Sequence, residues 1–182
     1  MQTFLPAMLE RGAPGHVVTT ASAAGLAVFP ERGSGYTYHA SKYAVIGLTE
    51  ALRRGLDDIG SPVSASVLIP GLVATRVADN SVEHAPGDSI DPDERDRISE
   101  MVAAGTAAAA AHGRDIDSVG AQTAAAVEAD TLYIPTDRLA EKAVLARAKA
   151  VVEAMPPASG YDSGLSTAMR SRRADRASDG TR

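Results

Sequence analysis

One long helical segment between two short apolar runs constrains the fold of this sequence more than any other feature. Apolar side chains recur at helical spacing along residues 38–59, at Val45, Leu48, Leu52, Leu56 and Ile59. An apolar run at 16–20 precedes this helix, and a second run at 63–69 follows it. The order strand, helix, strand is typical of parallel strands joined by a crossover helix. The sequence therefore predicts an α/β fold built on part of a doubly wound parallel sheet with flanking helices.

A second face of the same helix carries small residues, at Ala40, Ala44, Gly47, Ala51 and Gly55. Small side chains let a neighbouring element approach the helix backbone closely. Because an apolar stripe and a small-residue face lie side by side, we expect this helix to be largely enclosed.

Tyr38 and Lys42 lie four residues apart at the start of the helix, so their side chains share one face. A positive charge about 4 Å from a phenol is worth roughly 4 kcal/mol at an effective dielectric constant of about 20, which lowers the phenol pKa by about three units. Burial of the phenol opposes part of this effect. The pair therefore predicts proton transfer to or from a carbonyl or alcohol oxygen near neutral pH. Tyrosine and lysine also occur at this spacing by chance, as ordinary surface packing. The pair alone does not decide between a catalytic role and such packing.

The ends of the two predicted strands point to the same place. Ser22 follows the first apolar run, and the dipeptide Pro70-Gly71 follows the second. Ligands of open parallel sheets bind outside the carboxyl ends of the strands. We therefore expect Ser22, Pro70-Gly71 and the start of the 38–59 helix to converge. The Gly-x-Ser-x-Gly frame of a hydrolase nucleophile is absent around Ser22, so a nucleophilic role is not expected for this serine.

With these residues the sequence resembles the classical short-chain dehydrogenase/reductase family. The resemblance is close from residue 4 to about residue 75 and looser to about residue 155. It rests on three motifs in the family's order, Ser22, Tyr38-x-x-x-Lys42 and Pro70-Gly71-x-Val73-x-Thr75. The resemblance implies a Rossmann-like fold and hydride transfer between NAD or NADP and a small-molecule carbonyl or alcohol substrate.

The resemblance also implies a role for each of these residues. Tyr38 is the expected acid/base, Lys42 is expected to lower its pKa and to bind the nicotinamide ribose, and Ser22 is expected to hold the substrate oxygen. Val73 and Thr75 are expected to contact the nicotinamide carboxamide and a nearby phosphate. The residues implied in cofactor binding are Tyr38, Lys42, Pro70, Gly71, Val73 and Thr75.

The sequence departs from the family at its beginning. Family members open with a glycine-rich turn that binds the dinucleotide pyrophosphate, and no such turn precedes Ser22. We therefore expect these 182 residues to be the C-terminal portion of such a dehydrogenase and to bind the dinucleotide weakly or not at all. A truncated, non-catalytic remnant that acts only through association of chains is the alternative. The family's equivalent of the 38–59 helix often forms a subunit contact, so the resemblance also implies a homo-oligomer through this helix.

The sequence predicts one domain over residues 1–155, in which about 72–113 form a lid over the substrate. Residues 156–182 are expected to be a disordered tail. Capping residues predict three more helices. One begins at Asp91-Pro92 and runs to about Ala111, one is capped by Asp117 and ends at Glu128, and one is capped by Thr136 and ends near Met155. A short strand is expected at 132–134.

Composition narrows the possible functions. A net charge of −5 gives no reason to expect a nucleic-acid partner, and no apolar run reaches the roughly 18 residues of a membrane span. The chain has no cysteine, which is compatible with a cytoplasmic location. The histidines are scattered without ligand spacing, so no metal site is expected. We expect a soluble cytoplasmic protein that acts on small molecules.

Overall fold

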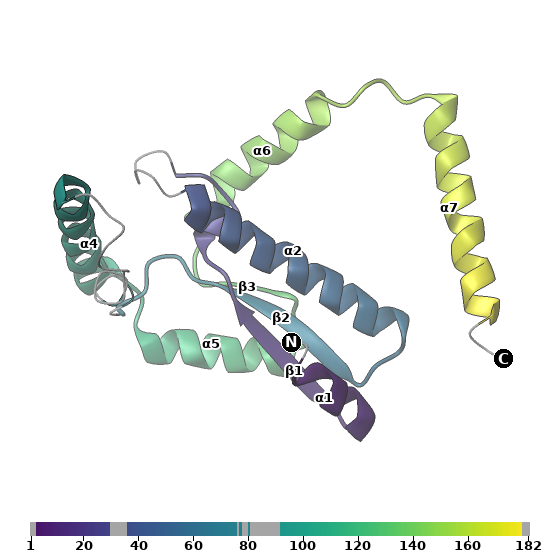
Figure 1. The fold of residues 1–182 in the computed structure, drawn as a ribbon, viewed down its shortest axis with the longest axis horizontal. Helices are drawn as coiled ribbons and strands as arrows, with labels where there is room; N and C mark the ends of the chain where they lie inside the picture. Colours follow the sequence, from purple (N-terminus) through teal and green to yellow (C-terminus); the bar gives the residue numbers. More distant parts are fainter. Residues whose placement is uncertain (1–2, 30–35, 76, 78–79, 81–91, 180–182) are drawn as a thin grey trace. The chain divides into compact units, whose positions relative to one another are not determined.

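The structure is a computed structural model that describes residues 3–29, 36–75, 77, 80 and 92–179 (Figure 1). The chain forms two compact units, Met1–Leu145 and Ala146–Arg182. This division lies earlier than the boundary that we expected after residue 155. The first unit contains a three-stranded sheet in the order β1-β2-β3.

Two of these strands and the helix between them form the centre of the first unit. They are β1 (Gly15–Thr20), α2 (Tyr36–Asp58) and β2 (Val63–Ile69). The two strands pair in parallel along the whole of β1, and α2 supplies the crossover that a parallel pair requires. The predicted α/β class with a parallel sheet is therefore confirmed.

The third strand, β3 (Tyr133–Pro135), pairs in parallel with the other side of β2, one residue further along than the predicted 132–134. The Tyr133 hydroxyl donates a hydrogen bond of 2.7 Å to Glu50 Oε1 on α2. This bond is the main reason why the pKa of Tyr133 rises to about 12. A side-chain bond thus holds this short strand to the crossover helix.

In the described residues, the other helices are α1 (Leu5–Arg11), the 3-10 helix η1 (Ala23–Gly25), α4 (Pro92–His112), α5 (Ile116–Glu128), α6 (Glu141–Glu153) and α7 (Gly160–Asp179). The predicted helix beginning near residue 92 is confirmed, whereas much of the predicted lid lies outside the described residues. Asp115 rather than Asp117 caps α5, because the Asp115 carboxylate accepts the Ser118 N–H at 2.9 Å.

Two expectations for the C-terminal region differ from the structure. Thr136 does not cap α6, which begins at Glu141, and its hydroxyl instead accepts the Gly71 N–H. The expected disordered tail contains α7, whose described side chains are all exposed. The Asp162 carboxylate accepts the N–H of Ser159 at 2.6 Å, a bond at the start of α7 that stabilises the helix locally. The polar composition of this tail is therefore compatible with a helix whose described side chains are all exposed.

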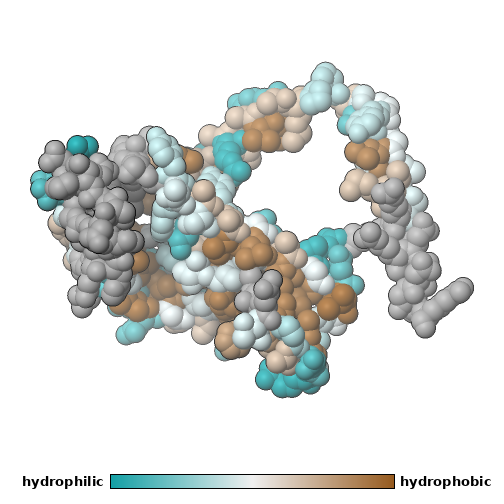
Figure 2. Space-filling model, viewed as in Figure 1, coloured by the Kyte–Doolittle hydropathy of each residue, from teal (hydrophilic) through white to brown (hydrophobic). Residues whose placement is uncertain are grey.

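α2 buries one face and exposes the other. Its buried residues are His39, Ile46, Thr49 and Leu56. Leu48 of the predicted stripe is 54% exposed, and every member of the small-residue face is exposed. Figure 2 shows hydrophobic surface over the region of α2 and β1. The expectation of a largely enclosed helix is therefore wrong for this chain.

Polar partners explain why the buried stripe of α2 includes a threonine. The Thr49 hydroxyl donates to the Val45 carbonyl at 2.7 Å, and it lies 2.6 Å from the Thr19 hydroxyl on β1. Because both hydroxyls are hydrogen-bonded, Thr49 is buried without an unsatisfied polar group. The helical spacing of apolar residues does not reveal a buried polar residue such as Thr49.

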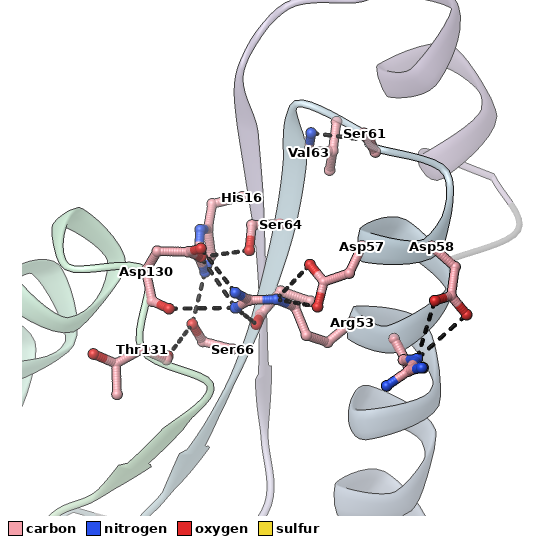
Figure 3. A network of polar contacts seen from close by, with 12 residues as sticks. His16, Arg53, Asp57, Asp58, Ser61, Val63, Ser64, Ser66, Asp130 and Thr131 are labelled. Carbon is pink, nitrogen blue, oxygen red and sulfur yellow. Dashed lines mark hydrogen bonds and ion pairs between the residues drawn. The ribbon is translucent and has the colours of Figure 1, made fainter.

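Arg53 joins three elements at the amino edge of the sheet (Figure 3). Its guanidinium donates to Asp57 on its own helix at 3.0 Å, to the Ala65 carbonyl on β2 at 3.4 Å and to Asp130, between α5 and β3, at 2.8 Å. The Arg53 side chain is only 18% exposed. Asp130 also accepts the Ser64 hydroxyl at 2.5 Å. This hydrogen bond and then the charge of Arg53 hold the pKa of Asp130 below its usual value, against the effect of burial.

His16 completes this edge by linking β1 to β2. The Ser66 hydroxyl donates to the Thr131 carbonyl at 2.7 Å, so its oxygen accepts a hydrogen bond from His16 Nε2–H, which lies 2.7 Å away. Burial lowers the pKa of His16, Asp130 opposes this effect, and the charge of Arg53 reinforces it. The network therefore favours a neutral His16.

Truncation of Arg53 tests the amino-edge network. We expect Arg53→Ala to lower the free energy of unfolding by about 1–2 kcal/mol, because three elements lose charge-assisted hydrogen bonds. Arg54→Ala is the matched control, since Arg54 pairs with Asp58 at the same spacing but reaches no second element through that bond. Its cost should stay below about 0.5 kcal/mol in the same urea titration. Equal costs for the two variants would contradict the role given to Arg53.

The pH dependence of stability tests His16. Its pKa is lower in the folded chain than the ordinary 6.5, so the unfolded chain binds more protons once the pH falls below 6.5. Stability should therefore be lost as the pH falls from 6.5 through the folded pKa. His16→Gln keeps a donor without a titrating ring, and it should lose less stability over this window. Parallel urea titrations on both sides of pH 6.5 measure the difference, and identical losses would refute the assignment.

Candidate active site

The loops that follow β1 and β2 lie against each other at the carboxyl edge of the sheet. The N–H of Ala23 donates to the Pro70 carbonyl at 2.8 Å, which continues the strand pairing beyond both strand ends. Gly25 then lets η1 lie against α2, because a Cβ at this position would be 2.7 Å from the Lys42 carbonyl oxygen. The structure thus brings the Ser22 loop, the Pro70-Gly71 turn and the first turns of α2 together, as the sequence predicts.

Tyr38 and Lys42 lie on one face of α2 at this edge. The Lys42 ammonium is 5.5 Å from the centroid of the Tyr38 ring and donates a long hydrogen bond of 3.5 Å to the Thr20 carbonyl at the end of β1. The Tyr38 side chain is 49% exposed, and its hydroxyl has no hydrogen-bond partner among the described residues. The arrangement places a cation beside an accessible phenol, which is suited to proton exchange with a bound molecule.

Ser22 is half-buried between the strand and η1. Its side-chain oxygen accepts the Ala24 N–H at 3.2 Å and caps the 3-10 helix. The hydroxyl proton is not used by this bond, so Ser22 keeps a donor for a ligand oxygen. The cap also fixes the direction of the side chain, which is what a positioning group requires.

The segment after β2 is fixed from two sides. The Gly71 N–H donates to the buried Thr136 hydroxyl at 2.9 Å, and a Cβ on Gly71 would lie 1.8 Å from the Asp137 carboxylate. On the other side, Val73 forms a parallel bridge with Arg114. Within the described residues, the Val73 N–H has no hydrogen-bond partner. Backbone fixed in this way leaves a defined donor free for a ligand.

Thr75 lies at the end of this segment and is half-buried. Its N–H donates to the Val73 carbonyl at 2.8 Å, and its hydroxyl has no partner within the part of the chain that the structure describes. The predicted cofactor-binding residues after β2 therefore lie in one short, well-braced segment.

Sequence reasoning missed three residues of this edge. Thr136 and Asp137 were assigned to a helix start or not assigned at all, although both touch Gly71. Arg114 was also missed, and its guanidinium donates to the Thr136 carbonyl. The signal in all three cases is position, because each follows a predicted strand or precedes a predicted helix at the edge where ligands bind.

His39, next to Tyr38, is a structural residue. It is buried, and its Nε2 accepts the Phe29 N–H at 3.3 Å. His39 therefore anchors the segment that follows η1. It serves packing at this edge rather than proton transfer.

A hollow of about 470 Å³ lies at the opposite, amino edge, and His16, Asp57, Ser64 and Asp130 are among its lining residues. Most of these groups bond to one another or to Arg53, and none is a predicted site residue. In the described ranges, no three side chains of the metal-binding types are grouped to hold an ion, and no helix is long and apolar enough to cross a membrane.

Comparison with known proteins agrees with the geometry. The family model described as short chain dehydrogenase matches residues 1–86, a range that contains every predicted site residue. A CLA biosynthesis dehydrogenase/reductase of Lactiplantibacillus plantarum is 30% identical over 139 residues, which are 75% of this chain and 47% of that protein. A 1-deoxy-11-beta-hydroxypentalenate dehydrogenase of Streptomyces avermitilis is 43% identical over 75 residues, which are 41% of this chain and 26% of that protein.

The fold is also that of known dehydrogenase structures. A short chain dehydrogenase/reductase from Burkholderia phymatum, solved in complex with NAD, superimposes with a TM-score of 0.72 and 27% identity over 87% of this chain and 55% of that one. The chain spans about half the length of these relatives or less. Residues 1–86 therefore match the short-chain dehydrogenase family, and the chain shares the fold of a solved short chain dehydrogenase/reductase.

Proposed function

We propose that the chain carries the acid/base site of an oxidoreductase that transfers hydride between NAD or NADP and a carbonyl or alcohol substrate. The observation that carries the proposal is the Lys42 ammonium 5.5 Å from the Tyr38 ring, at the edge where Ser22 and Pro70-Gly71 also meet. The non-catalytic alternative is not favoured, because packing alone gives no reason for an accessible phenol, a free serine proton and a cation at one edge.

The residues present fit the nicotinamide end of such a cofactor. The Val73 N–H and the Thr75 hydroxyl are donors without partners in the described part of the chain, and a carboxamide or phosphate oxygen is an acceptor that suits them. Lys42 is near enough to the end of β1 to hold a ribose hydroxyl beside Tyr38. The nicotinamide ring, when bound, supplies or accepts the hydride.

The chain's own residues would handle the proton and the substrate oxygen. Ser22 donates its free proton to that oxygen and fixes its position. Tyr38 gives a proton to the oxygen during reduction and takes it back during oxidation. Lys42 stabilises negative charge on the phenol oxygen while the proton is away.

The Tyr38→Phe variant tests this assignment. Removal of the phenol oxygen should lower turnover about a hundred- to ten-thousand-fold, because the proton relay is lost. The assay follows nicotinamide absorbance with a panel of ketones and secondary alcohols. Since the sequence predicts weak binding of the dinucleotide, the cofactors are supplied at millimolar concentration, NADH or NADPH with the ketones and NAD or NADP with the alcohols.

Tyr36→Phe is the matched control for this measurement. Tyr36 lies on the same turn of α2 and is 83% exposed, so loss of its hydroxyl should leave turnover unchanged. Undiminished turnover in Tyr38→Phe, or no turnover by the unaltered chain with either cofactor, would contradict the proposed function.

We further propose that the exposed small-residue face of α2 joins two copies of the chain. It combines Leu48 with a face that has no bulky side chain, which lets two helices approach closely. The apolar surface over α2 and β1 in Figure 2 is consistent with such a contact.

Gly47→Glu tests this association. A Cβ at Gly47 meets nothing within 4 Å, so the substitution does not disturb the packing within the chain, yet it places a charge in the proposed contact. We expect sedimentation to show a dimer or larger assembly for the unaltered chain and a monomer for Gly47→Glu. Gly120→Glu on α5 is the control, because that glycine is equally free of neighbours. A monomeric unaltered chain, or an unchanged assembly in Gly47→Glu, would exclude this contact.

A further inference from the structure

Arg114 is fixed at the carboxyl edge through both its backbone and its side chain. Its N–H donates to the Leu72 carbonyl at 2.9 Å, and its carbonyl accepts the Ala74 N–H at 3.0 Å. Its Nη1 donates to the carbonyl of Thr136, directly after β3. The residue before it, Gly113, has no room for a side chain, because a Cβ would lie 2.7 Å from the Ala74 nitrogen. Arg114 is therefore held closely against the segment that follows β2.

This pairing places the Arg114 side chain beside a predicted ligand contact. Arg114 and Val73 are direct partners in a parallel bridge, and such partners point their side chains to the same face, about 5 Å apart at Cβ. A molecule that contacts Val73 and the Thr75 hydroxyl thus comes within reach of the guanidinium.

Most of the donors of this guanidinium are unused. A guanidinium has five N–H donors, and within the described residues only the bond to Thr136 is made. Arg53, Arg54 and Arg138, by contrast, each pair with a carboxylate. The side chain of Arg114 is exposed, so its remaining donors are open to a ligand.

One carboxylate at this edge, that of Asp137, is already occupied. Asp137 lies against Gly71, its Oδ1 accepts the Leu139 N–H at 2.8 Å, and its Oδ2 lies 3.3 Å from the Thr136 hydroxyl. These bonds direct the Asp137 oxygens to its own loop. The positive charge of Arg114 is left without a counter-ion in the described part of the chain.

We propose that Arg114 is an anion-binding residue of this site and takes a carboxylate or phosphate through its free donors. Guanidinium groups bind both oxyanions through paired hydrogen bonds. The anion belongs either to the nucleotide, as the phosphate next to the nicotinamide ribose, or to the substrate, as a carboxylate. The identity of the molecule that carries it rests on the proposed function, whereas anion binding by Arg114 does not.

Calorimetric titration of the full chain tests the proposal with two matched pairs of probes. Nicotinamide mononucleotide and nicotinamide riboside differ by one phosphate, and pyruvate and acetone differ by one carboxylate. In the unaltered chain, one of the probes that carry the phosphate or the carboxylate should bind at least about tenfold more tightly than its counterpart without that group. This preference should disappear in Arg114→Gln and persist in part in Arg114→Lys, which keeps the charge but not the fork.

Arg138→Gln is the control, because Arg138 is also exposed at this edge but its guanidinium is bonded to Glu141. It should bind the probes as the unaltered chain does, and circular dichroism shows whether each variant is folded. A phosphate preference identifies the nucleotide as the ligand, and a carboxylate preference identifies the substrate. No preference in the unaltered chain, or an equal preference in a folded Arg114→Gln, overturns the proposal.

The two proposals fail separately. Tyr38→Phe should keep the anion preference while it loses turnover. A chain that prefers the anionic probe through Arg114 but shows no hydride transfer would refute the proposed function and leave the anion site in place.

Discussion

The pairing of β1 with β2 does not stop at the strand ends, and the arrangement of the site depends on its continuation. The N–H groups of Ala21 and Ala23 donate to the Leu68 and Pro70 carbonyls, both at 2.8 Å. Ser22 lies between these two bonds, so its position relative to the turn after β2 is set by the register of the sheet. A slip of one residue would turn the Ser22 side chain to the opposite face.

The two edges of the sheet use their polar groups differently. At the amino edge, Arg53 bonds to Asp57 and Asp130, and the imidazole of His16 bonds to Ser66. At the carboxyl edge, donors without partners remain in the described residues, among them the Val73 N–H. Mutual bonding stabilises the packing of the first edge, whereas free donors held in rigid backbone are typical of a ligand site.

The sequence predicts the strands, the crossover helix and the meeting of Ser22 with Pro70-Gly71, because periodicity and the direction of parallel strands are local properties. It does not predict contacts that depend on β3. Thr136 has the residue type of a helix cap, and only the pairing of β3 with β2 brings its hydroxyl to Gly71 instead. The same holds for Thr49, since its burial depends on a partner hydroxyl from β1 that helical periodicity does not register.

The packing of Gly25 restricts how this chain can change. The position that a methyl group would take on Gly25 is 2.7 Å from the backbone of Lys42 and 2.8 Å from the side chain of Ile46. Even alanine would force η1 away from α2, and with it the serine away from the tyrosine and lysine. Random mutagenesis followed by selection for a new substrate should therefore recover changes on the exposed surfaces around the site, while position 25 stays glycine because one hydrogen atom is all that the space allows.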